Sequence, residues 1–114
     1  MNSEIVFYPL FEREAKRLTK RYPSFKSDLR DFVEELRKNP YLGTELSPNI
    51  YKVRMAIKSK GRGKSGGARV ITLLLSVSEQ LMEVGLHYIY DKSDRTTLKD
   101  NEIRDILKRN GICS

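Results

Sequence analysis

The spacing of apolar residues changes once along the chain, from the period of a helix to that of a β-strand. From residue 10 the apolar side chains recur every three or four positions, as on one face of a helix: Phe11, Ala15, Leu18 and Tyr22. From residue 50 they alternate with polar ones, as in a strand with one buried face. Helices followed by consecutive strands predict an α+β fold.

Two amphipathic helices are expected in the first third of the chain. The first should stop at Tyr22, because Pro23 disfavours helical geometry in the residue before it and suits the first turn of a new helix. The second repeats the helical spacing over residues 25–36, and Asn39-Pro40 ends it. So short a break between them predicts an αα-hairpin. A short opening strand is expected over residues 4–8.

The strands that follow differ in their expected burial. Residues 50–57 have an apolar face and a basic face, whereas residues 68–77 are almost continuously apolar, which is typical of a central strand buried on both faces. Residues 81–90 supply another strand. Thr97 and Asp100 are candidate N-caps for a short last helix, which Gly111 closes.

The predicted fold is therefore one α+β domain over residues 1–114. It consists of an N-terminal αα-hairpin packed on a twisted antiparallel sheet of three to four strands, with a short C-terminal helix. The length of 114 residues suits one domain with a real core.

Positive charge is concentrated in the middle of the chain. No acidic residue lies between Glu45 and Glu79, and the cations of that interval are as many as the formal net charge of +7. They are Lys52, Arg54, Lys58, Lys60, Arg62, Lys64 and Arg69. Such clustering costs folding free energy unless a partner neutralises it, which favours a binding surface over a merely solvated face. Nucleic acid, anionic lipid and acidic protein are the partners that this leaves open.

Segment 58–67, KSKGRGKSGG, contains four glycines and no apolar residue, so an exposed, mobile loop is expected. Arg69 stands where this loop enters the buried strand. Two interpretations of Arg69 are equally favoured: a guanidinium at the surface end of the strand that binds a ligand, or one that donates hydrogen bonds to loop carbonyls.

Several kinds of chemistry are disfavoured by composition. Cys113 is the only cysteine, which leaves no disulfide framework or cysteine metal site within one chain. The carboxylates Asp91, Asp94 and Asp100 fit helix capping and surface pairing better than a metal site. His87 is the only histidine; on a half-buried strand it is usually structural, with substrate orientation as the alternative. No apolar run approaches the roughly 20 residues of a membrane span, and no secretion signal is visible, so a cytoplasmic protein is expected.

The order of elements, with EREAKRL in the first helix, then YKVRMAIKSKGRGKSGGARVI and later YIYDKSD, resembles the RelE/ParE superfamily of bacterial toxins. Within it the chain is most similar to the RelE-like HigB branch, and KSKGRGKSGGARVI is the most specific part. The resemblance implies a fold like that of microbial ribonucleases. It also implies a ribosome-dependent endoribonuclease that cuts mRNA by attack of a ribose 2′-OH on the adjacent phosphate, without a metal or another cofactor. A cognate antitoxin would inhibit it, with a monomeric free toxin and a hetero-oligomeric complex.

The resemblance also implies site residues. Lys52 and Arg54 match paired basic positions on the second strand of the family, Arg69 matches an arginine that clamps the scissile phosphate, and Lys92 falls among further active-site residues. These four are the predicted catalytic residues. The predicted contacts to RNA and ribosome are Lys58, Lys60, Arg62, Lys64, Tyr90 and Arg95.

The match changes after the last strand. Ser93 and Arg95 both remain candidates for an arginine of the family. Where the family has a tyrosine, this chain has only Thr96, Thr97, Leu98 and Lys99, so the general acid is unassigned. Tyr88 and Tyr90 can be read as base-stacking groups or, with more weight, as core residues. A ParE-like gyrase poison, a catalytically impaired binding module of the same fold, and a module for an acidic protein are the alternative functions.

Overall fold

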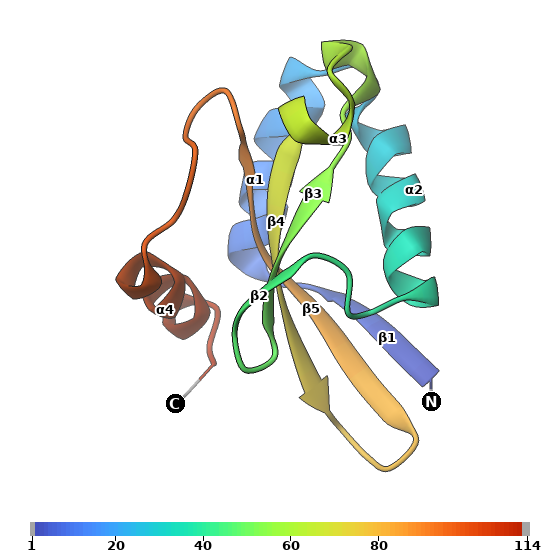
Figure 1. The fold of residues 1–114 in the computed structure, drawn as a ribbon, viewed down its shortest axis with the longest axis vertical. Coiled ribbons are helices and arrows are strands. Elements are labelled where there is room, and N and C mark those ends of the chain that lie inside the picture. The colour runs from blue at the N-terminus through green and yellow to red at the C-terminus, as the bar shows by residue number, and fades with distance from the viewer. Residues whose placement is uncertain (1, 113–114) are drawn as a thin grey trace.

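The computed structural model describes residues 2–112 and contains five strands as well as the helices (Figure 1). In chain order the elements are β1 (Asn2–Phe7), α1 (Pro9–Arg21), α2 (Phe25–Lys38), β2 (Thr44–Ser47), β3 (Ile50–Met55), the 3₁₀ turn η1 (Lys58–Lys60), α3 (Gly63–Gly66), β4 (Ala68–Ser76), β5 (Leu81–Asp91) and α4 (Asp100–Arg109). The helical hairpin begins and ends as its apolar spacing and its prolines predict. The helices are too short or too polar to cross a lipid bilayer within the described residues.

The sheet has the strand order β1-β5-β4-β3-β2. Its pairs are antiparallel except for β1, which runs parallel to β5. The predicted α+β class is confirmed, but the sheet has five strands rather than three to four. The additional strand is β2, which is exposed along its four residues. So short an exposed strand has no buried face and therefore no apolar alternation to read in the sequence.

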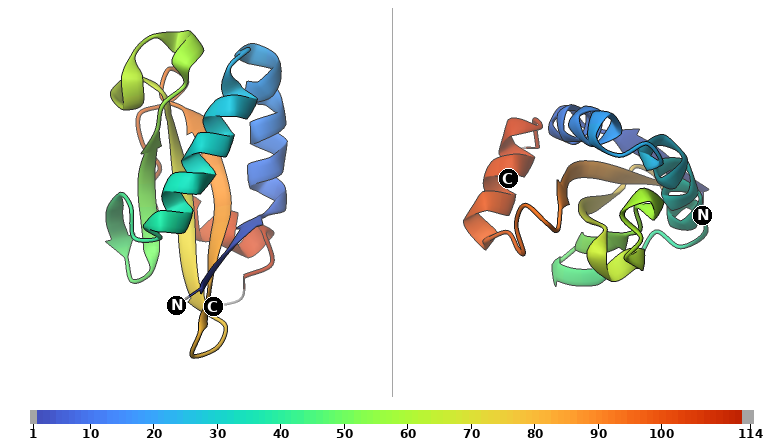
Figure 2. Two further views of the ribbon diagram at one scale, coloured as in Figure 1. Left: turned by 90° about the vertical axis from the view of Figure 1, so that its right-hand side faces the viewer. Right: turned by 90° about the horizontal axis from the view of Figure 1, so that it is seen from above.

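Helices α1 and α2 cover one face of the sheet (Figure 2). The core between them and the sheet buries Phe11, Leu18, Phe25, Phe32 and Leu36 against Val53, Met55, Val70, Val84, Leu86 and Ile89. The apolar face predicted for β3 is the one that meets these helices. Its basic face, with Lys52 and Arg54, therefore points to the opposite side of the sheet.

Helix α4 covers only part of that opposite side. Ile103, Ile106 and Leu107 pack there with Ile71 and Leu73 of β4. The N-cap is Lys99 rather than Thr97 or Asp100, because Glu102 accepts a hydrogen bond from the Lys99 N–H at 3.0 Å. Gly111 follows the helix with φ of +92°, the left-handed geometry for which glycine is suited. What α4 leaves uncovered is the β3 side of the sheet.

Asn110 fastens the end of α4 to the rest of the molecule. Its Oδ1 accepts a hydrogen bond from the Leu10 N–H at 3.0 Å, and its Nδ2 donates to the His87 carbonyl at 2.9 Å and lies 3.1 Å from His87 Nδ1. His87 is fully buried and stacks on Tyr8 with ring centroids 3.9 Å apart. Burial lowers the pKa of His87 to about 4, so the ring is neutral near pH 7. This position favours the structural interpretation of His87.

Replacing Asn110 with alanine should lower the free energy of unfolding by about 2 kcal/mol, because it leaves buried polar groups without partners. Asn101→Ala, at an exposed position of the same helix, is the matched control and should change it by less than about 0.5 kcal/mol. Urea denaturation measures both values. Equal stabilities of the two variants would show that Asn110 does not hold α4 in place.

Candidate nucleic-acid interface

The four predicted catalytic residues lie around one hollow on the β3 side of the sheet. The hollow has a volume of about 400 Å³. Its lining comprises Lys52, Arg54, Arg69 and Lys92 together with Glu35, Leu42, Gly43, Thr44, Val53, Lys64 and Thr96. We call it the basic hollow, because five of these residues are cations and one is an acid.

Strand register explains how the cations come together. Lys52 and Arg54 are two positions apart on β3 and share its face away from the helices, and Arg54 is directly opposite Arg69 on β4. Lys92 follows β5 immediately, and its N–H donates to the Gly67 carbonyl at 3.1 Å. Gly67 is required there, since a Cβ would lie 2.1 Å from the Met55 carbonyl oxygen. The close approach of these segments places Lys92 beside the two basic strands.

The predicted catalytic cations have no carboxylate partners among the residues that the structure describes. Among residues 2–112 the ion pairs involve none of Lys52, Arg54, Arg69 and Lys92. Arg54 and Lys92 are also exposed. Four cations around one concavity, without internal neutralisation, produce a local positive potential that favours a polyanion.

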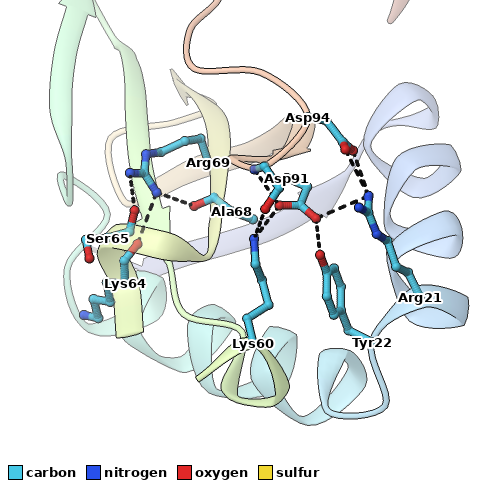
Figure 3. A network of polar contacts seen from close by, with 10 residues as sticks. Arg21, Tyr22, Lys60, Lys64, Ser65, Ala68, Arg69, Asp91 and Asp94 are labelled. Carbon is cyan, nitrogen blue, oxygen red and sulfur yellow. Dashed lines mark hydrogen bonds and ion pairs between the residues drawn. The ribbon is translucent and has the colours of Figure 1, made fainter. Parts of the chain in front are cut away.

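Arg69 is buried rather than at the surface, with an exposed fraction of 5%. Its guanidinium donates hydrogen bonds to the carbonyls of Lys64 at 3.1 Å, Ser65 at 2.9 Å and Ala68 at 3.1 Å (Figure 3). This is the loop-binding arrangement that was one of its two interpretations. Burial and then the charge of Arg54 lower the pKa of Arg69. Arg69 therefore positions the α3 turn at the rim of the basic hollow while adding its charge to it.

The segment over residues 58–67 is largely exposed, as predicted, and contains two short helical turns, η1 and α3. Carboxylates from distant parts of the sequence pair with its lysines. Lys58 Nζ lies 3.5 Å from Asp31, and Lys64 Nζ lies 2.9 Å from Glu35. Lys60 pairs with Asp91. Arg62 precedes α3 and is exposed. The segment 58–67 contains no acidic residue, but carboxylates from α2 and β5 surround it in the folded protein.

The expected exposure of Lys60 is wrong, and its contact to RNA stays an untested prediction. Its side chain is only 7% exposed, and its ammonium group donates to Asp91 Oδ1 and to Ser93 Oγ. The acid lies 31 residues later in the sequence, too far for a local charge pattern to indicate the pair. The charge of Lys60 is therefore paired with Asp91 inside the protein.

Asp91 is a fully buried carboxylate at the end of β5. It accepts hydrogen bonds from Lys60, from the hydroxyl of Tyr22 and, at 2.9 Å, from the Ser93 N–H, and Arg21 lies 3.4 Å away (Figure 3). Burial acts to raise its pKa, but the hydrogen bonds from Lys60, Tyr22 and Ser93 outweigh it and lower the pKa to about 2. Asp91 was expected to serve in helix capping or surface pairing, and its burial shows that this expectation is wrong.

Tyr90 and Arg95 lie outside the basic hollow. Tyr90 is 5% exposed in the cluster beneath α4, which favours its core interpretation over base stacking. Burial raises the pKa of its hydroxyl. Arg95 is 2.8 Å from Glu102, and its guanidinium carbon is 6.0 Å from the centroid of the Tyr90 ring. It faces a second hollow, which Tyr88 and residues of α1 also line.

Two features of the basic hollow were not found from the sequence. Glu35 is one of several acidic residues of α2, and its spacing in the sequence does not distinguish it from Glu34 as a lining residue. Thr96 lines the hollow in the segment where the family resemblance implies a tyrosine.

Within the described residues no group of three or more His, Cys, Asp or Glu side chains could hold a metal ion. Cys113 lies outside residues 2–112.

Comparison with known proteins does not identify a family. No protein-family model matches the chain, and no curated protein sequence matches it. The functional conclusion accordingly depends on the geometry of the basic hollow and on the sequence resemblance.

Replacing Asp91 with asparagine should lower the free energy of unfolding by about 3 kcal/mol at pH 7, because it leaves the Lys60 charge buried without its partner. The ordinary pKa of 3.8 falls to about 2 in the folded state, so the ionised carboxylate stabilises the protein above pH 4. This stabilisation is lost as the pH falls from about 4 to 2.

The difference between wild type and Asp91→Asn should therefore shrink over that pH range, as measured by chemical denaturation at each pH. Asp105→Asn, at an exposed carboxylate, is the control and should follow the wild type. A constant difference between pH 4 and 2 would contradict the assigned ionisation of Asp91.

Proposed function

We propose that this protein is the toxin of a type II toxin–antitoxin system and a ribosome-dependent endoribonuclease that inhibits translation. The observation that carries this proposal is the basic hollow, around which Lys52, Arg54, Arg69 and Lys92 gather without carboxylate partners among residues 2–112. The resemblance to RelE-like toxins had assigned catalytic roles to these same four positions. In the cell the protein acts in the cytoplasm and not at a membrane.

The hollow suits RNA because its cations can meet the phosphate chain. A single-stranded RNA lying in it would place a phosphate between Arg54 and Lys92, both exposed. Attack of the ribose 2′-OH on that phosphate builds negative charge on its oxygens. Fixed cations stabilise such charge more than they stabilise the ground state. Binding through phosphates also releases counterions, so affinity falls steeply with salt.

The cognate antitoxin of this proposal is an acidic protein that neutralises the same surface. The free cations of the hollow would be covered in a hetero-oligomer of toxin and antitoxin, and the free toxin would act as a monomer. Competition between antitoxin and RNA for one surface accounts for inhibition without any change in the fold.

A second candidate function is a gyrase poison or a binding module that has lost catalysis. The observation that favours it is Thr96, which lines the hollow where the resemblance places a tyrosine. The hydroxyl of Tyr90 is buried and cannot substitute at the surface. In growing cells, an induced DNA-damage response without loss of translation would support this candidate over the ribonuclease.

Addition of the purified protein to an in vitro translation reaction should produce new mRNA ends with a 5′-hydroxyl group, detected by primer extension. Arg54→Ala should reduce the rate of cleavage by about 100-fold, the effect of removing one preorganised charge from a transition state. Its stability should change by less than about 0.5 kcal/mol, because the side chain is exposed.

Arg104→Ala removes an exposed arginine from α4, away from the hollow, and serves as the control that keeps wild-type activity. If a folded wild-type protein produced no new ends, the ribonuclease proposal would fail. If Arg54→Ala cleaved as fast as Arg104→Ala, the site of cleavage would lie elsewhere on the protein.

A further inference from the structure

One carboxylate lines the basic hollow. Glu35 reaches it from α2, whereas the other ionisable lining residues are cations. Its neighbours on the helix, Phe32 and Leu36, are buried at 3% and 0% exposure in the main core. Because these residues anchor the helix against the sheet, the backbone that carries Glu35 is held in a fixed position relative to β3.

The carboxylate group is itself oriented. Lys64 Nζ, from the α3 turn, donates a hydrogen bond to Glu35 Oε2 at 2.9 Å. The α3 turn is in turn held by the guanidinium of Arg69, through the carbonyls of Lys64 and Ser65. The Glu35 side chain remains 44% exposed and lines the hollow, so its carboxylate is open to a molecule bound there.

The chemistry of the hollow requires a proton acceptor that the cations do not supply. An arginine guanidinium stays protonated in proteins and has no acceptor atom. A lysine ammonium group likewise has three donor hydrogens and no acceptor atom. A carboxylate is ionised at neutral pH and accepts hydrogen bonds through both oxygens.

We infer that Glu35 is the general base of the reaction, an inference that rests on the ribonuclease function proposed above. Glu35 takes the proton of the ribose 2′-OH as the 2′ oxygen forms a bond to phosphorus. The bond from phosphorus to the 5′ oxygen of the next nucleotide breaks, and that oxygen takes a proton from a lysine ammonium group of the hollow. The products are a 2′,3′-cyclic phosphate and a 5′-hydroxyl; Glu35 then loses its proton to water and the lysine regains one.

The alternative role for Glu35 is purely structural: it holds Lys64 in place. The two roles differ in their pH dependence. A general base must be ionised, so the cleavage rate falls at acidic pH as the base is protonated. If Glu35 only held Lys64, loss of that contact would lower the rate whichever partner is replaced. The acidic limb of the pH–rate profile would then remain.

The test is single-turnover cleavage of mRNA on programmed ribosomes, measured from about pH 4 to pH 8 so that the range spans the ordinary titration of a glutamate, together with the affinity for the same RNA. Glu35→Gln should lower the rate at pH 7 by about 10²- to 10⁴-fold, the usual contribution of a general base, and should abolish the acidic limb of the profile. RNA affinity should stay equal or increase, because a negative charge is removed. Glu34→Gln, one residue away and paired with Arg37, should behave as wild type.

Lys64→Met distinguishes orientation from proton transfer. This variant should retain the acidic limb because Glu35 is still present, even if its cleavage rate is lower than that of the wild type. If Glu35→Gln cleaved at the wild-type rate, or kept the acidic limb, the assignment of Glu35 as the base would be overturned while the ribonuclease function would stand. If the wild type cut no RNA, the proposed function itself would fail, and the inference with it.

Discussion

Asp91 accepts hydrogen bonds from three separate segments of the chain: the end of α1 through Tyr22, the η1 turn through Lys60, and the loop after β5 through Ser93. A buried carboxylate is costly unless its partners are all present, so these segments are held together as a unit. The η1 turn leads directly into α3, and the loop after β5 begins with Lys92. The rim of the basic hollow therefore depends on a carboxylate that does not line it.

The acid-free stretch in the middle of the sequence divides into two groups of cations in space. Lysines of the segment 58–67 pair with carboxylates of α2 and β5 and stabilise the position of that segment. Lys52 and Arg54 on β3 and Lys92 after β5 do not take part in such pairs within residues 2–112. Part of the positive charge of the chain therefore lies on one open part of the sheet, and these cations around the basic hollow are the main support for RNA as the ligand.

The sequence predicted the parts of the fold that have a strong local period. The helical hairpin, the basic face of β3 and the buried β4 follow from apolar spacing alone, whereas β2 has no buried face to produce a period. The site was predicted less completely, because side-chain partners are set by tertiary packing. Local sequence placed Lys60 on the surface, but its partner Asp91 is brought to it by the sheet. Glu35 was likewise indistinguishable from Glu34 until β3 and α3 were placed beside it.

The most direct test is to map the surface of the protein that RNA contacts. A short single-stranded RNA with 2′-O-methyl sugars has no free 2′-OH to attack phosphorus, so it can be titrated into ¹⁵N-labelled protein and followed by amide chemical shifts. We expect the largest shifts at Lys52, Arg54 and Lys92, and we expect added salt to weaken them. Shifts confined to the exposed face of α1, around Lys16 and Lys20, with the basic hollow unchanged, would contradict it.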